Sequence, residues 1–290
     1  NEASTFTLII NNITDQIKQI LLSYQKKLFV NMFINSAQNK FAFIKGTVNV
    51  GQKTKIKMPS KGLNLTAKFP AADLQPWYAW YIKNIAKQTN TNFSGILNSA
   101  TLQVDKLNLL GQSLTNFSVR YTPYTNYLLF NIISNNIIGN INIPKQVSVN
   151  KPIVAKFKKF YLKASTQSSP NKQQQIKLNN YYNVNFNLAD FRYNQIKFGA
   201  LSGKMRTTNS NGLIINPLNA QSANYKLISQ IAWNNINNMT RFKGQLTSTN
   251  TAKFLAGLGL SGQVYSKNAN AKFDLQWRGF PTDFKLSNLN

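Results

Sequence analysis

The sequence contains no cysteine and no histidine among its 290 residues. Without thiols it can form neither a disulfide nor a thiol nucleophile, and without histidine it lacks the usual zinc ligand sets and every His-based catalytic triad. Acidic residues are also scarce, since 7 of them stand against 34 Lys and Arg, for a formal net charge of +27. These absences exclude most familiar catalytic classes.

The few acidic residues are spread along the chain. They are Glu2, Asp15, Asp73, Asp105, Asp190, Asp274 and Asp283. None lies two to four residues from another, so the sequence forms no local carboxylate pair and no calcium loop. The GLGLSG segment at residues 257–262 has the glycine spacing of a dinucleotide loop, but it follows a predicted helix and has no acidic residue about 20 positions later. We therefore expect no enzyme activity, no catalytic residue, no metal site and no cofactor.

Long hydrophobic runs are missing as well. No run approaches the ~20 apolar residues that span a bilayer. The first residues, Asn1-Glu2-Ala3, show neither Met nor a charged region before an apolar stretch, so no signal peptide is expected, and a membrane anchor is expected outside this sequence. Because 42% of the residues are hydrophobic, the chain can nevertheless bury a sizeable core.

The positive charge has two explanations. Lys, Asn and Ile are all abundant and the basic residues are scattered singly, which is typical of an AT-rich coding sequence with a solvated basic surface. A polyanionic partner, either nucleic acid or a membrane with anionic lipids, is the alternative. Under either explanation the chain is expected to favour an anionic surface.

Alternation of apolar and polar residues is the dominant pattern. LNLTAKF at residues 63–69 and YNVNFNL at residues 182–188 each place apolar side chains on one face and Asn, Thr or Lys on the other. Such alternation predicts strands with one wet face, and the scarcity of continuous apolar runs favours antiparallel pairing. The predicted fold is mainly β: a long, twisted antiparallel sheet that forms an open groove, with a few short helices.

Three segments show helical spacing instead. Residues 14–28 carry Ile17, Ile20, Leu21 and Tyr24 with Thr14 or Asp15 as a cap. Residues 73–87 begin with Asp73 and place a proline in the first turn. Residues 249–259 combine a Thr or Asn cap with a glycine stop. Three short helices cannot cover a sheet of this length, so either a second sheet or a ligand is expected on its apolar face.

Two segments echo each other at a separation of 84 residues. The stretch that begins at Leu107 aligns without a gap with the stretch that begins at Phe191, and Leu114 falls on Phe198. This favours repeat units near residues 104–144 and 188–228 within one continuous segment, residues 1–290, of an elongated sheet.

The last third of the chain carries a specific set of motifs. Residues 275–284 read ϕ-x-W-x-G-x-P-x-x-F, with Trp277, Gly279, Pro281 and Phe284. Before them come Ala232-Trp233, the strand at residues 240–244 and a helix that ends L-x-x-L-G at residues 255–259. These motifs resemble those of the AsmA-like bacterial envelope proteins, specifically their YhdP branch, and the order of elements upstream, from IKMPSKGLNLTAKFP through IGNINIP, fits the same family.

The resemblance implies a bridge for phospholipid transport. Family members are anchored in the inner membrane of Gram-negative bacteria by a helix outside this sequence, and they extend a β-groove through the periplasm toward the outer membrane. Phospholipids would then be the ligand, and both membranes would be reached through other parts of the parent protein. Trp277, Gly279, Pro281 and Phe284 would shape the rim.

The groove floor is expected on the apolar faces of the strands. Its candidate residues are Leu63, Leu65, Phe69, Leu107, Leu109, Leu128, Phe130, Val184, Phe186, Leu188, Phe273 and Leu275. Each of these could instead belong to a closed core. Scattered lysines on the outer face or the lip could attract anionic headgroups.

Two other functions compete with lipid transport. A nucleic-acid-binding module is favoured by the charge and predicts an affinity that falls steeply with salt. A structural envelope β-sandwich without a ligand predicts a filled core between two sheets. An open apolar face would favour lipid transport over both.

Overall fold

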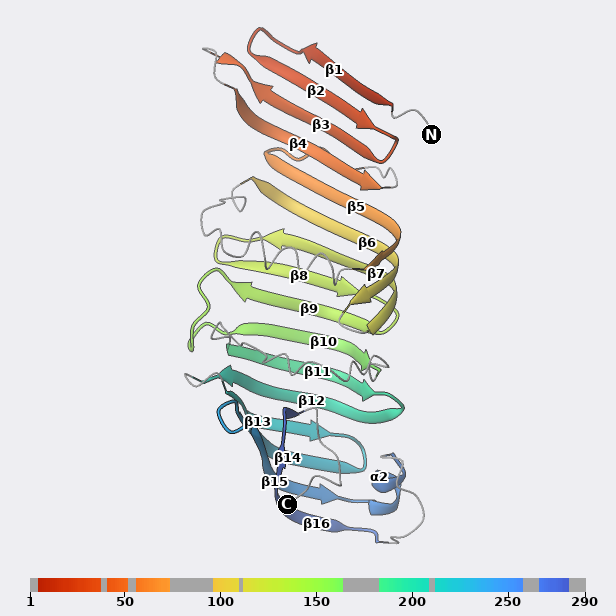
Figure 1. Ribbon diagram of the computed structural model, residues 1–290, viewed down its shortest axis with the longest axis vertical. Helices are drawn as coiled ribbons and strands as arrows, with labels where there is room; N and C mark the ends of the chain where they lie inside the picture. The colour runs from red at the N-terminus through yellow and green to blue at the C-terminus, as the bar shows by residue number, and fades with distance from the viewer. Residues whose placement is uncertain are drawn as a thin grey trace. The chain divides into compact units, whose positions relative to one another are not determined.

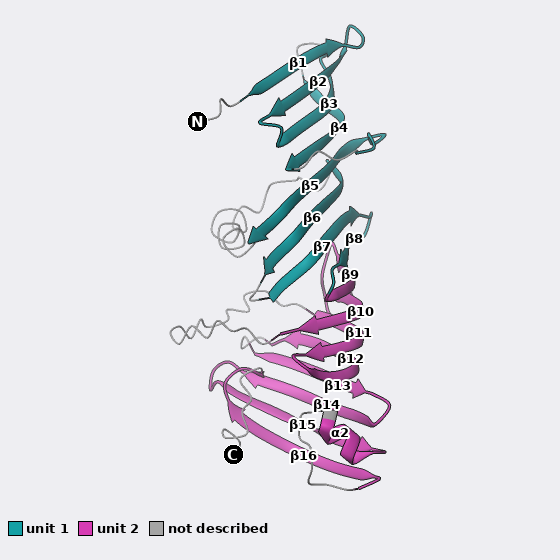
Figure 2. Cartoon of the chain, turned by 90° about the vertical axis from the view of Figure 1, so that its right-hand side faces the viewer, with its two compact units in different colours: residues 1–135 teal, residues 136–290 magenta. Residues whose placement is uncertain are grey.

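A computed structural model describes residues 5–37, 41–51, 56–73, 96–109, 112–163, 183–208, 212–257 and 266–281. The chain divides into two compact units, unit 1 at residues 1–135 and unit 2 at residues 136–290 (Figure 2). In each unit the strands follow one another in sequence order, and each is hydrogen-bonded to the next (Figure 1).

Every described element of unit 1 is a strand. The strands are β1 (Phe6–Asn12), β2 (Ile17–Tyr24), β3 (Leu28–Asn35), β4 (Ala42–Gly51), β5 (Gly62–Asp73), β6 (Leu97–Leu109), β7 (Gln112–Pro123) and β8 (Tyr127–Ile133).

Unit 2 adds a short helix to its strands. Its elements are β9 (Ile137–Pro144), β10 (Ile153–Leu162), β11 (Asn183–Tyr193), β12 (Ile196–Thr207), β13 (Leu213–Gln221), β14 (Tyr225–Asn234), β15 (Met239–Ser248), α2 (Thr251–Gly257) and β16 (Ala269–Arg278). The predicted fold class is confirmed, since the described chain is mainly β, with open sheets and little helix.

The expectation of purely antiparallel pairing is wrong at three junctions. β4 pairs with β5 in parallel, β5 pairs with β6 in parallel, and so does β10 with β11. Parallel neighbours need a connection that crosses from one end of the strand to the other, and the chain has a long connection at each of these junctions. Alternation within a strand is the same for both pairings, so the pattern could not distinguish them.

The helix predicted at residues 14–28 is also wrong. Residues 17–24 form β2, which lies between β1 and β3, with Leu22 opposite both Leu8 and Val30. Thr14 does accept hydrogen bonds from the amides of Gln16 and Ile17, at 3.3 and 3.0 Å, but these bonds close the turn before β2 and cap no helix. The apolar spacing of this segment fits both the helical period of about 3.6 residues and the strand period of two. The segment forms a strand because β1 and β3 pair with it on both edges.

The other predicted helices have different outcomes. The helix at residues 249–259 is confirmed as α2, and the Asn250 side chain caps it by accepting a 3.0 Å hydrogen bond from the Lys253 amide. The helix predicted at residues 73–87 lies outside the described residues apart from Asp73, which ends β5.

The two segments that align at 84 residues form the same kind of hairpin. Leu109 pairs with Gln112 where β6 meets β7, and Tyr193 pairs with Ile196 where β11 meets β12. The two pairs are therefore separated by 84 residues, the same separation at which the two sequence segments align. The repeat units themselves stay a prediction.

Candidate functional site

Strand register gathers the apolar side chains of unit 1 on one face. Leu8 lies opposite Leu22, which lies opposite Val30, and Val30 lies opposite Val48. Val48 in turn lies opposite Leu65 in the parallel pair. We call this surface the apolar face of unit 1: Phe6, Leu8, Ile10, Ile20, Leu22, Leu28, Val30, Met32, Val48, Val50, Leu63, Leu65, Ala67, Phe69, Ala100, Leu102, Val104, Phe117, Val119, Tyr121, Leu128, Phe130 and Ile132.

The other face of the same strands is largely polar from β4 onward. Thr47 lies opposite Asn64, and Asn64 lies opposite Ser99. Arg120 lies opposite Thr101 and Asn131. A sheet sealed on both sides would show apolar residues on both faces, whereas β4 to β8 have one largely polar face and one apolar face.

Strand register also gathers apolar side chains on one face of unit 2, from β9 to β16. Phe157 lies opposite Leu188, and Leu188 lies opposite Leu201. Farther along, Phe242 lies opposite Ile231 and Leu275. We call this surface the apolar face of unit 2: Ile137, Ile141, Ile153, Ala155, Phe157, Phe160, Val184, Phe186, Leu188, Phe191, Phe198, Leu201, Met205, Leu213, Ile215, Leu218, Ala220, Tyr225, Leu227, Ile231, Trp233, Phe242, Leu246, Phe273, Leu275 and Trp277.

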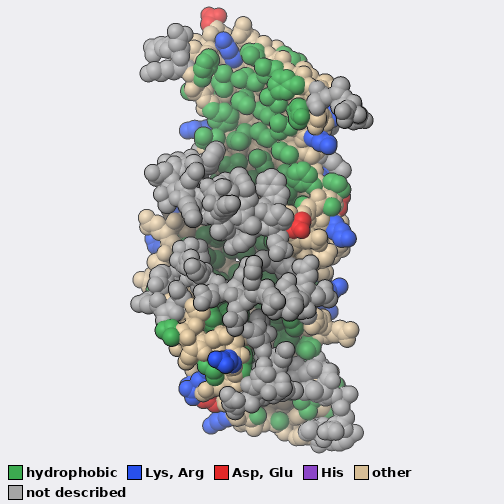
Figure 3. Space-filling view, viewed as in Figure 1, with side chains coloured by type: hydrophobic (Ala, Val, Ile, Leu, Met, Phe, Trp, Pro, Cys, Tyr) green, Lys and Arg blue, Asp and Glu red, His purple; other side chains and the backbone are tan. Residues whose placement is uncertain are grey.

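Most side chains of the apolar face in unit 1 are half-buried or exposed. Phe6 keeps 59% of its surface exposed and Leu8 keeps 50%, while Leu63, Leu65 and Phe69 are half-buried. Figure 3 shows hydrophobic side chains gathered over β1 to β4 on the side of unit 1 toward the viewer. An apolar patch of this extent is unusual on a surface that faces only water.

Five of the seven candidate floor residues of unit 1 lie on its apolar face, and the other two, Leu107 and Leu109, do not. Leu63, Leu65 and Phe69 line β5, and Leu128 and Phe130 line β8, so the register brings these five to the apolar face. Phe130 contacts Tyr121 of β7 with ring centroids 5.4 Å apart.

Leu107 differs from the other candidates because it is fully buried. It is 0% exposed and pairs with Leu114, which is 2% exposed, while the neighbouring pair Val104 and Phe117 is buried as well. This cluster holds the β6–β7 hairpin together as a small core. Leu109 lies at the end of β6, where it pairs with Gln112 and is half-buried.

The candidate floor residues of unit 2 all lie on its apolar face. Val184, Phe186 and Leu188 are consecutive apolar-face positions of β11, and Phe273 and Leu275 are the corresponding positions of β16. Leu188 is buried, while Val184, Phe186, Phe273 and Leu275 are half-buried.

An aromatic row on the same face was missed by the sequence interpretation. Phe157 and Phe160 have ring centroids 4.9 Å apart, Phe160 and Phe191 lie 6.3 Å apart, and Phe191 and Phe198 lie 5.5 Å apart. A register shift after Phe157 moves Phe160 back to the apolar face, so simple alternation assigns it to the wrong side. The spacing of Phe157 and Phe160 in KFKKFY, with two residues between them instead of one, is the signal that could have found it.

The family motif forms an aromatic cluster at the end of β16. Trp277 is 2% exposed, and the ring of Phe280 lies 5.0 Å from that of Trp233. The Thr240 hydroxyl, itself fully buried, donates a 2.6 Å hydrogen bond to the carbonyl of Gly279. Gly279 has a φ of 115°, which only glycine adopts readily, and this turns the chain toward the apolar face.

Of the two remaining motif residues, Pro281 and Phe284, the structure describes only Pro281. Pro281 follows the cluster and is half-buried, whereas Phe284 lies outside the described residues. The Trp277 indole donates to the carbonyl of Phe280 at 3.2 Å.

The polar face of unit 2 holds both of its described acidic residues in ion pairs. Asp190 accepts hydrogen bonds from Tyr161 and Arg192, and Asp274 accepts from Arg241. Burial raises the pKa of Asp190, but the hydrogen bonds from Arg192 and Tyr161 outweigh it and leave that pKa below its usual value. The hydrogen bond from Arg241 lowers the pKa of Asp274.

Tyr225 joins α2 to the apolar face. Its ring lies 4.8 Å from that of Phe254 in α2, and its hydroxyl donates a 2.6 Å hydrogen bond to the carbonyl of Phe198. Burial raises the pKa of Tyr225 to about 12.

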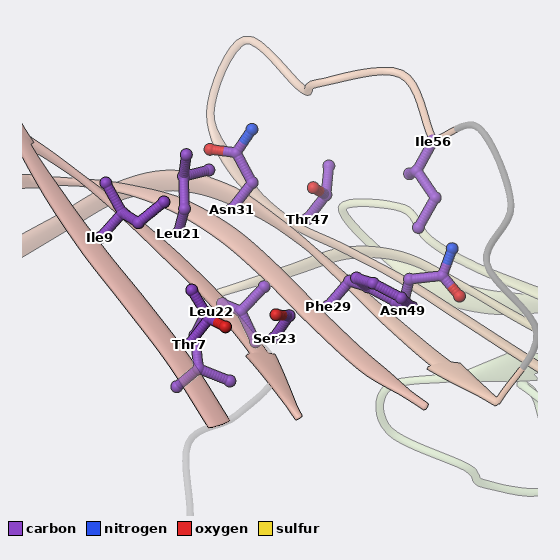
Figure 4. Close-up of a pocket in the computed structure, with 11 residues that line it drawn as sticks. Thr7, Ile9, Leu21, Leu22, Ser23, Phe29, Asn31, Thr47, Asn49 and Ile56 are labelled. Atoms are coloured by element: carbon purple, nitrogen blue, oxygen red, sulfur yellow. The ribbon is translucent and has the colours of Figure 1, made fainter. Parts of the chain in front are cut away.

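A shallow pocket of about 390 Å³ lies on unit 1 (Figure 4). Most of its lining comes from the face opposite the apolar face, and Ile56 of the β4–β5 connection closes one side. Its lining residues are Thr7, Ile9, Leu21, Leu22, Ser23, Phe29, Val30, Asn31, Thr47, Asn49 and Ile56. The pocket carries no charged side chain and is too open and mixed in character to specify a ligand.

Neither a metal centre nor a membrane-spanning helix is found in the described part of the chain. No group of three or more acidic, His or Cys side chains there is arranged to hold an ion. No helix there has the length and hydrophobicity needed to cross a bilayer.

Comparison with known proteins gives one result that covers nearly the whole chain. The family model described as YhdP protein matches residues 2–290. No curated protein and no solved structure matches. The sequence resemblance in the last third therefore extends over both units, and the chain belongs to the YhdP family.

Proposed function

We propose that this chain is a segment of a lipid-transfer bridge in the cell envelope, which carries the acyl chains of phospholipids along its apolar face between the inner and outer membranes. The observation that carries this proposal is the register of successive strands. It places half-exposed Leu, Val, Ile and Phe side chains on one face of each unit, strand after strand.

The energetics favour a hydrocarbon ligand on such a surface. An acyl chain in water is unfavourable by about 0.8 kcal/mol per CH₂ group, and contact with an apolar face removes much of that cost. Apart from Lys106, which follows Val104 by two residues in β6 and is exposed, the register brings apolar side chains together along these faces. A chain can therefore lie along them without leaving a charge unsolvated.

The proposal also accounts for transport without a specific pocket. Neighbouring apolar-face positions have similar side chains, such as Leu22, Val30 and Val48 in unit 1, so a lipid gains similar contacts at each strand. A sequence of similar, weak sites permits movement from strand to strand, whereas one deep site would trap the ligand.

The test is lipid occupancy of the protein purified without detergent, measured by native mass spectrometry and by extraction of bound lipids. A matched pair of variants separates the two faces of one strand: Phe130→Asp on the apolar face and Asn131→Asp beside it on the polar face. We expect Phe130→Asp to lower occupancy of unit 1 about tenfold, since it removes roughly two CH₂ groups' worth of contact at about 0.8 kcal/mol each.

Asn131→Asp adds the same charge on the wet side and should leave occupancy unchanged. If purified protein carries no lipid, or if both variants lower occupancy equally, the proposal is wrong. Salt-sensitive binding of an oligonucleotide in place of lipid would favour the nucleic-acid alternative.

A further inference from the structure

We infer that unit 2 favours phospholipids whose headgroup carries a net negative charge, because the two lips of its apolar face are lined with cations. This inference rests on the proposed function and adds the headgroup class. A lip is here the row of strand ends and connections along one side of the apolar face.

Register defines the two lips of unit 2. The first lip holds the end of β9, the starts of β10 and β11, the end of β12, the start of β13, the end of β14, the start of β15 and the end of β16. The second lip holds the opposite ends of the same strands, together with α2, which lies between β15 and β16.

Both lips carry exposed basic side chains. On the first lip these are Lys145, Lys151, Arg206 and Arg278. On the second lip they are Lys163, Lys197, Lys226, Lys253 and Lys267.

No acidic residue lies on either lip within the described part of unit 2. The described acidic residues of this unit, Asp190 and Asp274, lie inside β11 and β16 rather than at their ends. Each is paired with an arginine, Arg192 or Arg241, and Asp190 also interacts with Lys197 of the second lip.

The position of Lys253 connects the lip to the apolar face directly. It precedes Phe254, whose ring packs 4.8 Å from that of Tyr225, a residue of the apolar face. The helix therefore holds an exposed ammonium group beside apolar surface, which is the arrangement that a lipid with a wet headgroup and a buried tail requires.

Headgroup position explains why charge on the lip selects among lipids. When acyl chains lie on the apolar face, the headgroup must stay in water, and the nearest water is at a lip. A basic residue near an anionic headgroup contributes about 1 kcal/mol, which corresponds to about fivefold in occupancy. A zwitterionic headgroup gains less, because its ammonium group is repelled by the same lysines.

The experiment offers the protein a choice of headgroups with identical tails. Vesicles of equimolar phosphatidylglycerol and phosphatidylethanolamine, both with the same acyl chains, are incubated with the protein. The vesicles are removed by flotation, the protein is recovered from the dense lower fraction, and its bound lipids are counted by mass spectrometry. We expect bound phosphatidylglycerol to exceed phosphatidylethanolamine about fivefold in 0.15 M salt, and the excess to shrink in 1 M salt, where the screening length falls to about 3 Å.

Two variants remove the same amount of charge from different places. The lip variant changes Lys145, Lys151, Lys253 and Lys267 to Gln. The control variant changes four exposed lysines of the polar face, Lys156, Lys204, Lys243 and Lys272, to Gln. All eight side chains are exposed, so both variants should keep the far-UV circular dichroism of the parent.

The inference predicts that the lip variant binds the two lipids in nearly equal amounts, while the control variant keeps the excess of phosphatidylglycerol. Lipid bound by the parent protein in the vesicle ratio would overturn the inference and leave the proposed function intact. Equal loss of preference in both variants would also overturn it, since net charge alone would then suffice. A parent protein that takes up no lipid would remove the proposed function and the inference with it.

Discussion

Two leucines on adjacent strands represent two kinds of apolar side chain, one buried in a small core and one on the open apolar face. Leu107 of β6 is 0% exposed, whereas Leu65 of β5 is half-buried on the apolar face of unit 1. The same substitution, Leu→Ala, at these two positions removes the same atoms from two different environments.

The expected costs differ by a factor of about three. At Leu107 the substitution leaves a cavity among buried neighbours, and fully buried Leu→Ala changes cost about 2–5 kcal/mol. At Leu65 the side chain is already partly in contact with solvent. No closed cavity remains there, and the cost should be about 1 kcal/mol.

Urea unfolding of lipid-free protein, followed by circular dichroism, measures both free energies of unfolding. Thr66→Ala, on the polar face next to Leu65, serves as the control and should change the free energy by less than about 0.5 kcal/mol. Lipid occupancy should move in the opposite order, with Leu65→Ala weakening it and Leu107→Ala leaving it unchanged per folded molecule. Equal stability costs at Leu65 and Leu107 would refute the reasoning, because Leu65 would then be sealed inside a core.

Two further predictions concern packing and pH. Gly203→Ala should cost about 1–3 kcal/mol in thermal unfolding, because the added Cβ would lie 2.6 Å from the Phe186 ring and 3.0 Å from the carbonyl oxygen of Pro217; Ser202→Ala, on the other face, should cost far less, and equal costs would contradict this account. The Tyr225 phenol has a pKa of about 12 in the folded protein against about 10 when unfolded, so its protonated form stabilises the fold fully below pH 10 and this stabilisation disappears as the pH rises through 12. Unfolding measured from pH 9 to 12 should show this loss in the parent and a smaller one in Tyr225→Phe, and an unchanged slope in the variant would assign the loss to other groups.

The alternation of apolar and polar residues was sufficient to predict that the fold is mainly β and which face of these strands is apolar. LNLTAKF and NVNFNL lie in β5 and β11 with the expected faces, because a half-buried strand requires that pattern and little else produces it over six or seven residues. The predicted floor residues Leu63, Leu65, Val184 and Phe186 therefore reached the apolar face for the reason given from sequence.

The errors arose where neighbouring strands decide the outcome. The apolar spacing of residues 17–24 fits both a helix and a strand. Pairing with β1 and β3 makes the segment a strand, and this pairing cannot be predicted from the spacing within the segment. The burial of Leu107 depends on Leu114 and Phe117 across a hairpin, so its alternation alone could not distinguish floor from core. Phe160 was missed because a register shift reverses the alternation after Phe157.

The order of strands within each unit has a consequence for how such a protein can change its size. Because each strand pairs only with the strands before and after it in sequence, gain or loss of a hairpin disturbs two junctions and leaves every other one as it was. Evolution can therefore lengthen or shorten the sheet by whole hairpins without changing how the remaining strands pair, so the number of strands can vary independently of the chemistry on their surface.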